Sequence, residues 1–303
     1  MLMRMLGEPF IENFASVALS PEPDLAVVAL MIARIEYPHL DATRYIDRLD
    51  ALGEEASRRV ATASRLPEEA PRFADPLTLA QITALSDYLF IEERFTGNQQ
   101  HYEDPRNSYL NEVLDRRTGI PISLGLVYME VARRAGLRVE GVNFPGHFLV
   151  RCPAPRRTLD DGGDLIIDAF HGGALLSEEA CQLLLERHTN GETVRDVRRF
   201  ARASKTQIVV RMLLNLKRTY VKMHSFPQAR DVTELLLAVN PSAIGELRDR
   251  GLLAYHMNDF HRALRDLEAY LERVPPAGPA DKEEHAQIWE HVRALRKRVA
   301  SLN

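Results

Sequence analysis

The chain has 303 residues, enough for one large or two ordinary domains, and its 45% apolar and 27% charged residues are typical of globular proteins. The net charge of −4 gives no global electrostatic basis for binding nucleic acid or an anionic membrane, so we expect neither as a partner. Cys152 and Cys181 are too few for a disulfide framework and lack metal-ligand spacing, which favours a cytoplasmic location. No signal peptide is recognisable, and the longest apolar run, Leu25 to Ala33, falls short of the ~20 residues of a membrane span.

Helical periodicity dominates the first third of the chain. Apolar residues recur at helical spacing in three segments, at residues 25–32, 45–52 and 79–89. Asp41 precedes the second segment and offers a cap, while the Pro-rich stretch from Leu66 to Pro76 predicts a loop. Residues 1–95 are therefore expected to form a helical region that packs on the core following it.

The middle of the chain, residues 96–205, mixes helix and strand signals. Turn residues at Gly97-Asn98 and at 104–107 precede a predicted helix over residues 121–135. Strands are predicted by their apolar and β-branched residues, with a turn at Pro145-Gly146 and a further helix starting at Ser177. The predicted strands span residues 138–144, 148–152 and 165–167. The fold class predicted for the chain is α+β, with a small antiparallel sheet in this region.

The last third, residues 206–303, repeats itself every 34 residues. A Met, a Phe, an Ala and a Pro recur at this interval, a period typical of tetratricopeptide (TPR) helix hairpins. The repeated positions are Met223, Phe226, Ala229 and Pro241, followed by Met257, Phe260, Ala263 and Pro275. A helix from Asp281 to Leu302, which contains Trp289, is expected to cap the repeats. Such a region binds a protein or peptide partner or packs on its own domain, and the sequence leaves both open.

A family resemblance rests on the run from Phe95 to Arg151, which contains RRTGIPISLGLVYMEVARRAGLRVEGVNFPGHFLVR, and on LIIDAFHGG after it. Together with the repeats, these segments closely resemble the SirB family of bacterial transglutaminase-like proteins with C-terminal TPR repeats. The resemblance implies a papain/transglutaminase-like core. Active members of that superfamily start a helix with Gly-x-Cys, end it with Arg-x-x-Gly, and place a His and an Asp on the strands that follow.

The resemblance carries over unevenly to the catalytic positions of this chain. Its Gly119 matches the glycine, Gly136 the helix end, His147 the histidine and Asp168 the aspartate, but counting back from Gly136 places Pro121 at the nucleophile position. A thiol enzyme needs a thiolate at a helix N-terminus beside a histidine held by a carboxylate. Because proline carries no nucleophile, we favour a non-catalytic scaffold that binds a protein or peptide.

Two alternatives remain open. In the first, the chain is a hydrolase or acyltransferase in which Ser123 is the nucleophile, His147 the base and Asp168 its orienting group. Ser123 lies about 200° around the helix from Pro121, so a capping role is favoured for it. In the second, the chain is a regulatory adaptor that acts only through the face of its TPR repeats.

Further polar residues are candidates for a binding groove upstream of the helix. They could contact a peptide, although turn and packing roles are favoured for them; they are Glu92, Glu93, Asn98, Tyr102, Asn107 and Asn111. His171 is a second candidate base. His147, Asp168 and His171 lack the usual spacing of metal ligands, and no phosphate-binding glycine loop is present, so we expect neither a metal nor another cofactor.

Overall fold

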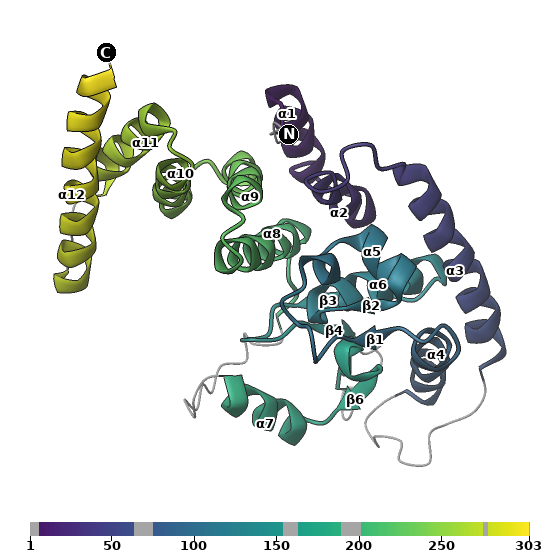
Figure 1. Ribbon diagram of the computed structural model, residues 1–303. Coiled ribbons are helices and arrows are strands. Elements are labelled where there is room, and N and C mark those ends of the chain that lie inside the picture. Colours follow the sequence, from purple (N-terminus) through teal and green to yellow (C-terminus); the bar gives the residue numbers. More distant parts are fainter. Residues whose placement is uncertain (1–5, 64–74, 154–162, 189–200, 275–277, 303) are drawn as a thin grey trace. The chain divides into compact units, whose positions relative to one another are not determined.

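The computed structural model describes residues 6–63, 75–153, 163–188, 201–274 and 278–302 (Figure 1). It divides into two compact units, one of Met1–Pro21 with Leu213–Asn303 and the other of Glu22–Met212. Helices and a small antiparallel sheet make up the fold, which confirms the α+β class. The three-part division at residues 95/96 and 205/206 stays a prediction. Within the described residues, no helix is both long and apolar enough to cross a membrane.

The first helices of the Glu22–Met212 unit lie where the periodicity predicts them. They are α2 (Leu25–Ala33), α3 (Ala42–Thr62) and α4 (Pro76–Ser86), and a π-helix, η1 (Asp87–Glu92), continues α4. Each of the three begins after an aspartate whose carboxylate accepts a hydrogen bond from a free backbone N–H group of the first turn. The capping role predicted for Asp41 is confirmed, since it accepts from Thr43 N at 3.0 Å. Most of the loop predicted for residues 66–76 lies outside the described residues.

The sheet has the strand order β3-β4-β5-β6, with every neighbouring pair antiparallel. Its strands are β3 (Glu140–Val142), β4 (Leu149–Cys152), β5 (Leu165–Asp168) and β6 (Ala174–Leu176). The hairpin predicted around Pro145-Gly146 is confirmed, and Gly146 takes a positive φ of 66° in its turn. The sequence did not predict β6, nor the short parallel pair β1 (Thr96–Gly97) and β2 (Thr118–Gly119).

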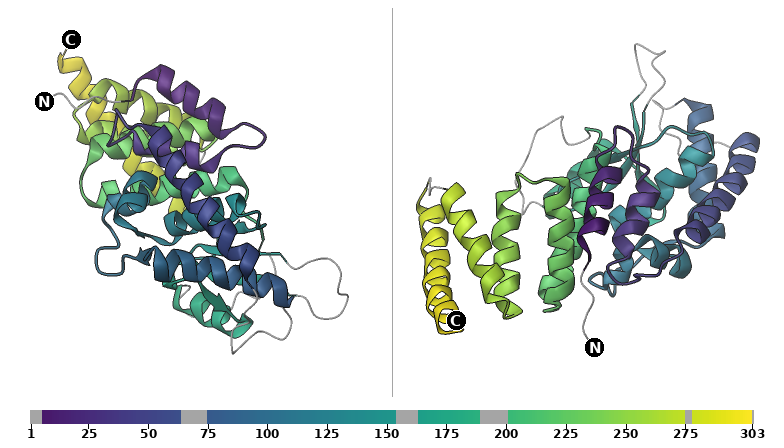
Figure 2. Two further views of the ribbon diagram at one scale, coloured as in Figure 1. Left: turned by 90° about the vertical axis from the view of Figure 1, so that its right-hand side faces the viewer. Right: turned by 90° about the horizontal axis from the view of Figure 1, so that it is seen from above.

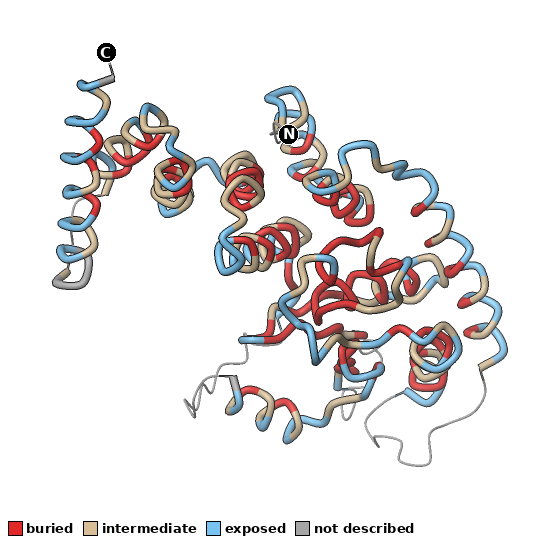
Figure 3. The backbone as a smooth tube through the Cα atoms, in the orientation of Figure 1, coloured by how far each residue is buried: buried red, intermediate tan, exposed pale blue. Residues whose placement is uncertain are grey.

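The helix α6 (Pro121–Arg134) is the centre of this unit and is buried over most of its length (Figure 3). It packs against α3, α5 (Leu110–Arg116) and β4, and near the 3₁₀ helices η2 (Pro105–Ser108) and η3 (Ala169–His171). Two glycines make these contacts close. A Cβ on Gly53 of α3 would lie 2.2 Å from Cβ of Arg134, and a Cβ on Gly125 would lie 2.6 Å from the ring of Phe148. The predicted helix 121–135 is thus confirmed, and the sheet packs on it through β3 and β4.

The other unit is helical, as the 34-residue repeat predicts. Its elements are α1 (Glu8–Ala18), most of α8 (Lys205–Lys222), α9 (Phe226–Val239), α10 (Ile244–His256), α11 (Phe260–Arg273) and α12 (Pro279–Leu302). The helices α9 to α12 follow one another in a row (Figure 2), each packed on the next. The cap is α12, which buries Ile288, Val292 and Leu295 against α11, while Trp289 stays 37% exposed. The α1 helix packs on α9.

Candidate functional site

His147 and Asp168 form a buried pair in the Glu22–Met212 unit. The distance between His147 Nε2 and Asp168 Oδ1 is 2.9 Å, and both residues are less than 5% exposed. The pair therefore has the geometry of the base and its orienting carboxylate in a triad. The roles assigned to these two residues in catalysis remain a prediction.

Local structure fixes both members of the pair. Asp168 is the last residue of β5 and caps η3, where its Oδ1 accepts from the backbone N–H groups of Phe170 and His171. His147 follows the hairpin turn, which its own N–H closes by donating to Phe144 O. The Arg211 guanidinium of α8 then donates to His147 O at 2.6 Å and to Phe144 O at 3.1 Å. The main chain of His147 and the side chain of Asp168 are thus each held by hydrogen bonds that do not depend on a ligand.

His171 joins the pair as a third member. Its Nδ1 lies 2.8 Å from Asp168 Oδ2, so the carboxylate bonds one imidazole through each oxygen. The rings of His147 and His171 stack with 5.8 Å between centroids and 26° between planes. Unlike the other two residues, His171 has a side chain that is 48% exposed, and it forms the solvent-facing side of the cluster.

The charges in the cluster favour an ionised Asp168. Burial raises the pKa of this carboxyl, but its hydrogen bonds and electrostatic interactions with His147 and His171 outweigh the effect of burial, so the pKa is lowered overall. The two thiols of the chain, in contrast, both have a raised pKa. Burial raises the pKa of Cys152 and Cys181 to about 11, with the charge of Asp168 adding to the effect on Cys181. Neither cysteine is a thiolate at neutral pH.

Ser123, the predicted alternative nucleophile, is the third residue of α6 and is 1% exposed. Its Oγ lies 2.6 Å from Asn107 O, to which it donates, and accepts from Ile120 N at 3.0 Å. The second bond is one half of a capping box, in which the N3 side chain binds the backbone of the N-cap residue. The structure thus brings His147 and Asp168 together, while the Ser123 hydroxyl bonds the backbone of η2 and of the helix start.

The predicted groove residues lie upstream of α6, with Glu92 at the end of η1, Asn107 in η2, Asn111 in α5 and the others in the segments between these elements. Asn98 Nδ2 donates to Asn107 Oδ1 at 3.1 Å, and the Asn107 amide donates to the backbone of His101. Asn107 is fully buried and Asn111 is 2% exposed. Each of the two acidic candidates forms an ion pair, Glu93 with Arg117 and Glu92 with Arg59. Tyr102 differs from all of these, because it is 46% exposed and its ring contacts Phe170, next to His171.

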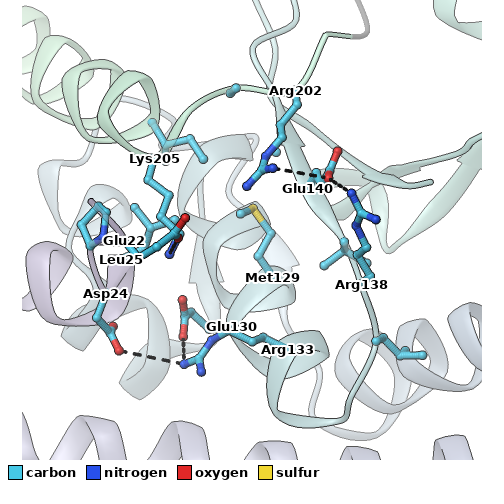
Figure 4. Close-up of a pocket in the computed structure, with 16 residues that line it drawn as sticks. Glu22, Asp24, Leu25, Met129, Glu130, Arg133, Arg138, Glu140, Arg202 and Lys205 are labelled. Atoms are coloured by element: carbon cyan, nitrogen blue, oxygen red, sulfur yellow. Dashed lines mark hydrogen bonds and ion pairs between the residues drawn. The ribbon is translucent and has the colours of Figure 1, made fainter. Parts of the chain in front are cut away.

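A pocket of about 380 Å³ lies elsewhere in the same unit, between α2, α6, β3 and the start of α8 (Figure 4). Its lining combines apolar side chains with charges of both signs. The apolar residues include Leu25, Met129 and Ile208, and the ion pairs are Arg138–Glu140, Arg202–Glu140, Arg133–Asp24, Arg133–Glu130 and Lys205–Glu22. Burial raises the pKa of Glu140, yet its arginine neighbours lower it overall. The pocket therefore offers an apolar surface between acidic and basic side chains that pair with one another.

Comparison with known families agrees with this architecture. Residues 43–214 match the model of the transglutaminase-like superfamily, which covers more than half of the chain. The chain belongs to the transglutaminase-like superfamily. Its residues 216–298 also match a tetratricopeptide repeat model, which confirms the predicted repeats.

Individual relatives of this transglutaminase-like protein come from bacteria and animals. A UPF0162 protein of Xylella fastidiosa is 37% identical over 284 residues, which cover 92% of this chain and 94% of the relative. The UPF0162 protein YchA of Escherichia coli K12 is 26% identical over 249 residues, or 82% of this chain and 85% of YchA. F-box only protein 21 of Homo sapiens is 33% identical over 207 residues, which are 66% of this chain but only 32% of that protein.

Two residues of the transglutaminase-like site were undervalued or missed in the sequence. The sequence indicates His171 as a second base and as a weakly supported metal ligand, whereas the structure places it in direct contact with Asp168, three residues earlier at the start of η3. Arg211 was not considered at all. It lies 64 residues after His147 along the chain, and no motif connects the two.

Proposed function

We propose that this protein is a non-catalytic member of the transglutaminase-like superfamily and binds a peptide or an extended segment of a protein partner. The observation that carries this proposal is the chemistry at the start of α6. Proline stands at residue 121, where the resemblance expects the thiol, and the nearby Ser123 hydroxyl donates to Asn107 O. A hydroxyl that both donates and accepts within the backbone is poorly prepared to attack a substrate.

The two thiols support the same conclusion. Nucleophilic cysteines have a lowered pKa and access to solvent. Cys152 and Cys181 are instead buried, with pKa values of about 11. His147 and Asp168 thus lack a thiolate partner on this chain, and their mutual bond joins the turn before β4 to the end of β5.

The pocket beside α6 supports peptide binding. A peptide presents apolar side chains together with amide groups and both signs of charge, and the lining offers partners for each of these. Arg138 and Arg202 can receive a carboxylate, Asp24 can receive an ammonium group, and Met129 can contact an apolar side chain. Ligand sites commonly combine apolar walls with a few polar groups in this way.

The test combines an activity assay with peptide capture. Purified protein is incubated with a glutamine peptide and a fluorescent amine, and separately with a peptide amide substrate; we expect no product above the level of the His147→Ala variant. The same proteins, immobilised, are offered a synthetic pool of random heptapeptides. We expect the wild type and His147→Ala to enrich the same peptides, and Met129→Glu to lose them. The control is Leu77→Glu, which changes an exposed apolar side chain outside the pocket lining.

Turnover that His147→Ala abolishes would overturn the non-catalytic proposal and favour the Ser123 enzyme. Labelling with a serine-directed phosphonate tests the Ser123 enzyme directly, since equal labelling of wild type and Ser123→Ala excludes Ser123 as nucleophile.

The adaptor hypothesis rests on the TPR match and predicts a different outcome. It is favoured if partner binding survives changes at His147 and Met129 but is lost on changing the exposed Val221 and Met223 of the α8 region.

A further inference from the structure

The cluster of His147, Asp168 and His171 has a feature that a catalytic pair does not require. Each of the three residues offers a ligand atom, and these atoms all lie within 4.8 Å of one another. The carboxylate lies between two imidazole nitrogens, with separations of 2.9 Å and 2.8 Å. Two imidazoles and one carboxylate are a common ligand set for divalent transition metal ions in proteins.

We propose that His147 Nε2, His171 Nδ1 and the Asp168 carboxylate together bind a divalent first-row transition metal ion such as Zn²⁺. This inference goes beyond the proposed function and does not depend on it, because metal binding requires no peptide ligand. The spacing of these residues along the chain does not predict a metal site. The sheet brings them together, with His147 next to β4 and Asp168 at the end of the neighbouring β5.

The two nitrogen–oxygen separations are close to those that an ion imposes. With metal–ligand bonds of about 2.1 Å, neighbouring ligand atoms lie about 3.0 Å apart at right angles and about 3.4 Å apart in a tetrahedron. The measured nitrogen–oxygen separations of 2.9 and 2.8 Å lie near the lower end of this range. The two imidazole nitrogens lie within 4.8 Å of each other, so metal binding requires side-chain rotations that let both nitrogens and the carboxylate face one ion.

The surroundings of the cluster prepare it for an ion in three ways. Asp168 Oδ1 is fixed by hydrogen bonds from the backbone N–H groups of Phe170 and His171. His147 is held through its backbone by Arg211. The third ligand, His171, is half exposed, which gives an ion a route from solvent and leaves space for water in its remaining positions. Sites with three protein ligands and an open position are typical of exchangeable or reactive metal ions.

Metal titration of the full chain, without an affinity tag and after chelator treatment, tests the proposal. Co²⁺ is added while its visible absorption is followed, and Zn²⁺ is then added as competitor; calorimetry gives the stoichiometry. We expect one Co²⁺ per chain, displaced by Zn²⁺. His171→Ala is expected to weaken Zn²⁺ binding roughly tenfold or more, because it removes a ligand atom. The half-exposed position of His171 makes this variant compatible with folding, which circular dichroism checks.

His39→Ala is the matched control, since this histidine is exposed and lies outside the cluster. It should leave the affinity unchanged. The metal affinity of Asp168→Asn is a second measurement, because the amide of this variant keeps a hydrogen-bond acceptor but lacks the negative charge that a cation requires. The proposal is overturned if the wild type shows no saturable Co²⁺ or Zn²⁺ binding at micromolar metal. It is equally overturned if His171→Ala binds as tightly as His39→Ala, since the ion then lies elsewhere.

Discussion

Ser123 Oγ lies 2.6 Å from the main-chain oxygen of Asn107, and this hydrogen bond ties the start of α6 to the turn of η2 sixteen residues earlier. The same oxygen atom accepts from Ile120 N. One buried hydroxyl therefore satisfies a carbonyl and an N–H group that the surrounding core shields from water.

Replacing Ser123 with alanine is expected to destabilise the fold. The variant leaves Asn107 O and Ile120 N with weaker partners in a buried setting, which costs about 1 to 3 kcal/mol of unfolding free energy. Urea denaturation measures the loss. Ser301→Ala is the control, because that hydroxyl is exposed and bonds the last turn of α12. If the stability of Ser123→Ala equals that of the wild type, the result contradicts a structural role for Ser123 and favours the hypothesis that Ser123 is the nucleophile.

Arg211 provides a second test of how the site is held. Replacing it with glutamine removes guanidinium bonds to His147 O and Phe144 O, so we expect a loss of about 1 to 3 kcal/mol and faster amide exchange in the β3–β4 hairpin. Hydrogen exchange with mass spectrometry locates the change. Arg218→Gln, on the exposed side of the same helix, is expected to leave the exchange of the hairpin unaltered.

Local patterns explain which parts of the fold the sequence predicts. The helices α2, α3 and α6 and the strands β4 and β5 are each defined by periodicity or by turn residues at their own ends. The strand β6 has only three residues, too few for a pattern, and it is set by pairing with β5 after two glycines of positive φ. The 34-residue repeat predicts α9 to α11 because the residues that start, pack and end each helix of a hairpin recur at fixed positions in the sequence.

The site was predictable only in part, for a similar reason. His147 and Asp168 follow from the family resemblance, and their pairing follows from adjacent strands. The bond from Ser123 to Asn107 depends on how the loop before α6 folds back, and the bond from Arg211 depends on where α8 lies. Contacts of this kind arise from tertiary packing, which a single sequence does not display.

Two glycines of α10 form a matched pair for testing the TPR packing. A Cβ on Gly251 would lie 2.8 Å from two carbon atoms of the buried Leu267, whereas a Cβ on Gly245 would meet nothing within 4 Å. We expect Gly251→Ala to cost about 1 to 3 kcal/mol through overpacking against α11. Gly245→Ala is expected to stabilise by up to about 1 kcal/mol, because alanine favours the helix. Equal effects of the two changes would show that close packing is not what Gly251 provides.

Asp231 of α9 should make the stability of the helical unit depend on pH. It is 7% exposed, and burial raises its pKa from 3.8 to about 6, although a backbone bond from Leu6 and the charge of Arg230 act against the increase and Glu234 adds to it. Between these two pH values the unfolded chain releases a proton that the folded chain keeps. Rising pH therefore favours unfolding in this window, and the stabilising contribution present below pH 3.8 is lost by the time the pH passes about 6.

Replacing Asp231 with asparagine should remove this dependence while preserving the acceptor for Leu6 N. The expected difference is roughly 3 kcal/mol in favour of the variant at pH 7, falling towards zero near pH 4, since each pKa unit corresponds to about 1.4 kcal/mol. Urea denaturation at a series of pH values measures it, with Asp47→Asn as an exposed control. A variant that follows the wild type at every pH would mean that the Asp231 carboxyl is ionised in the folded protein at no cost, because water or a cation reaches it.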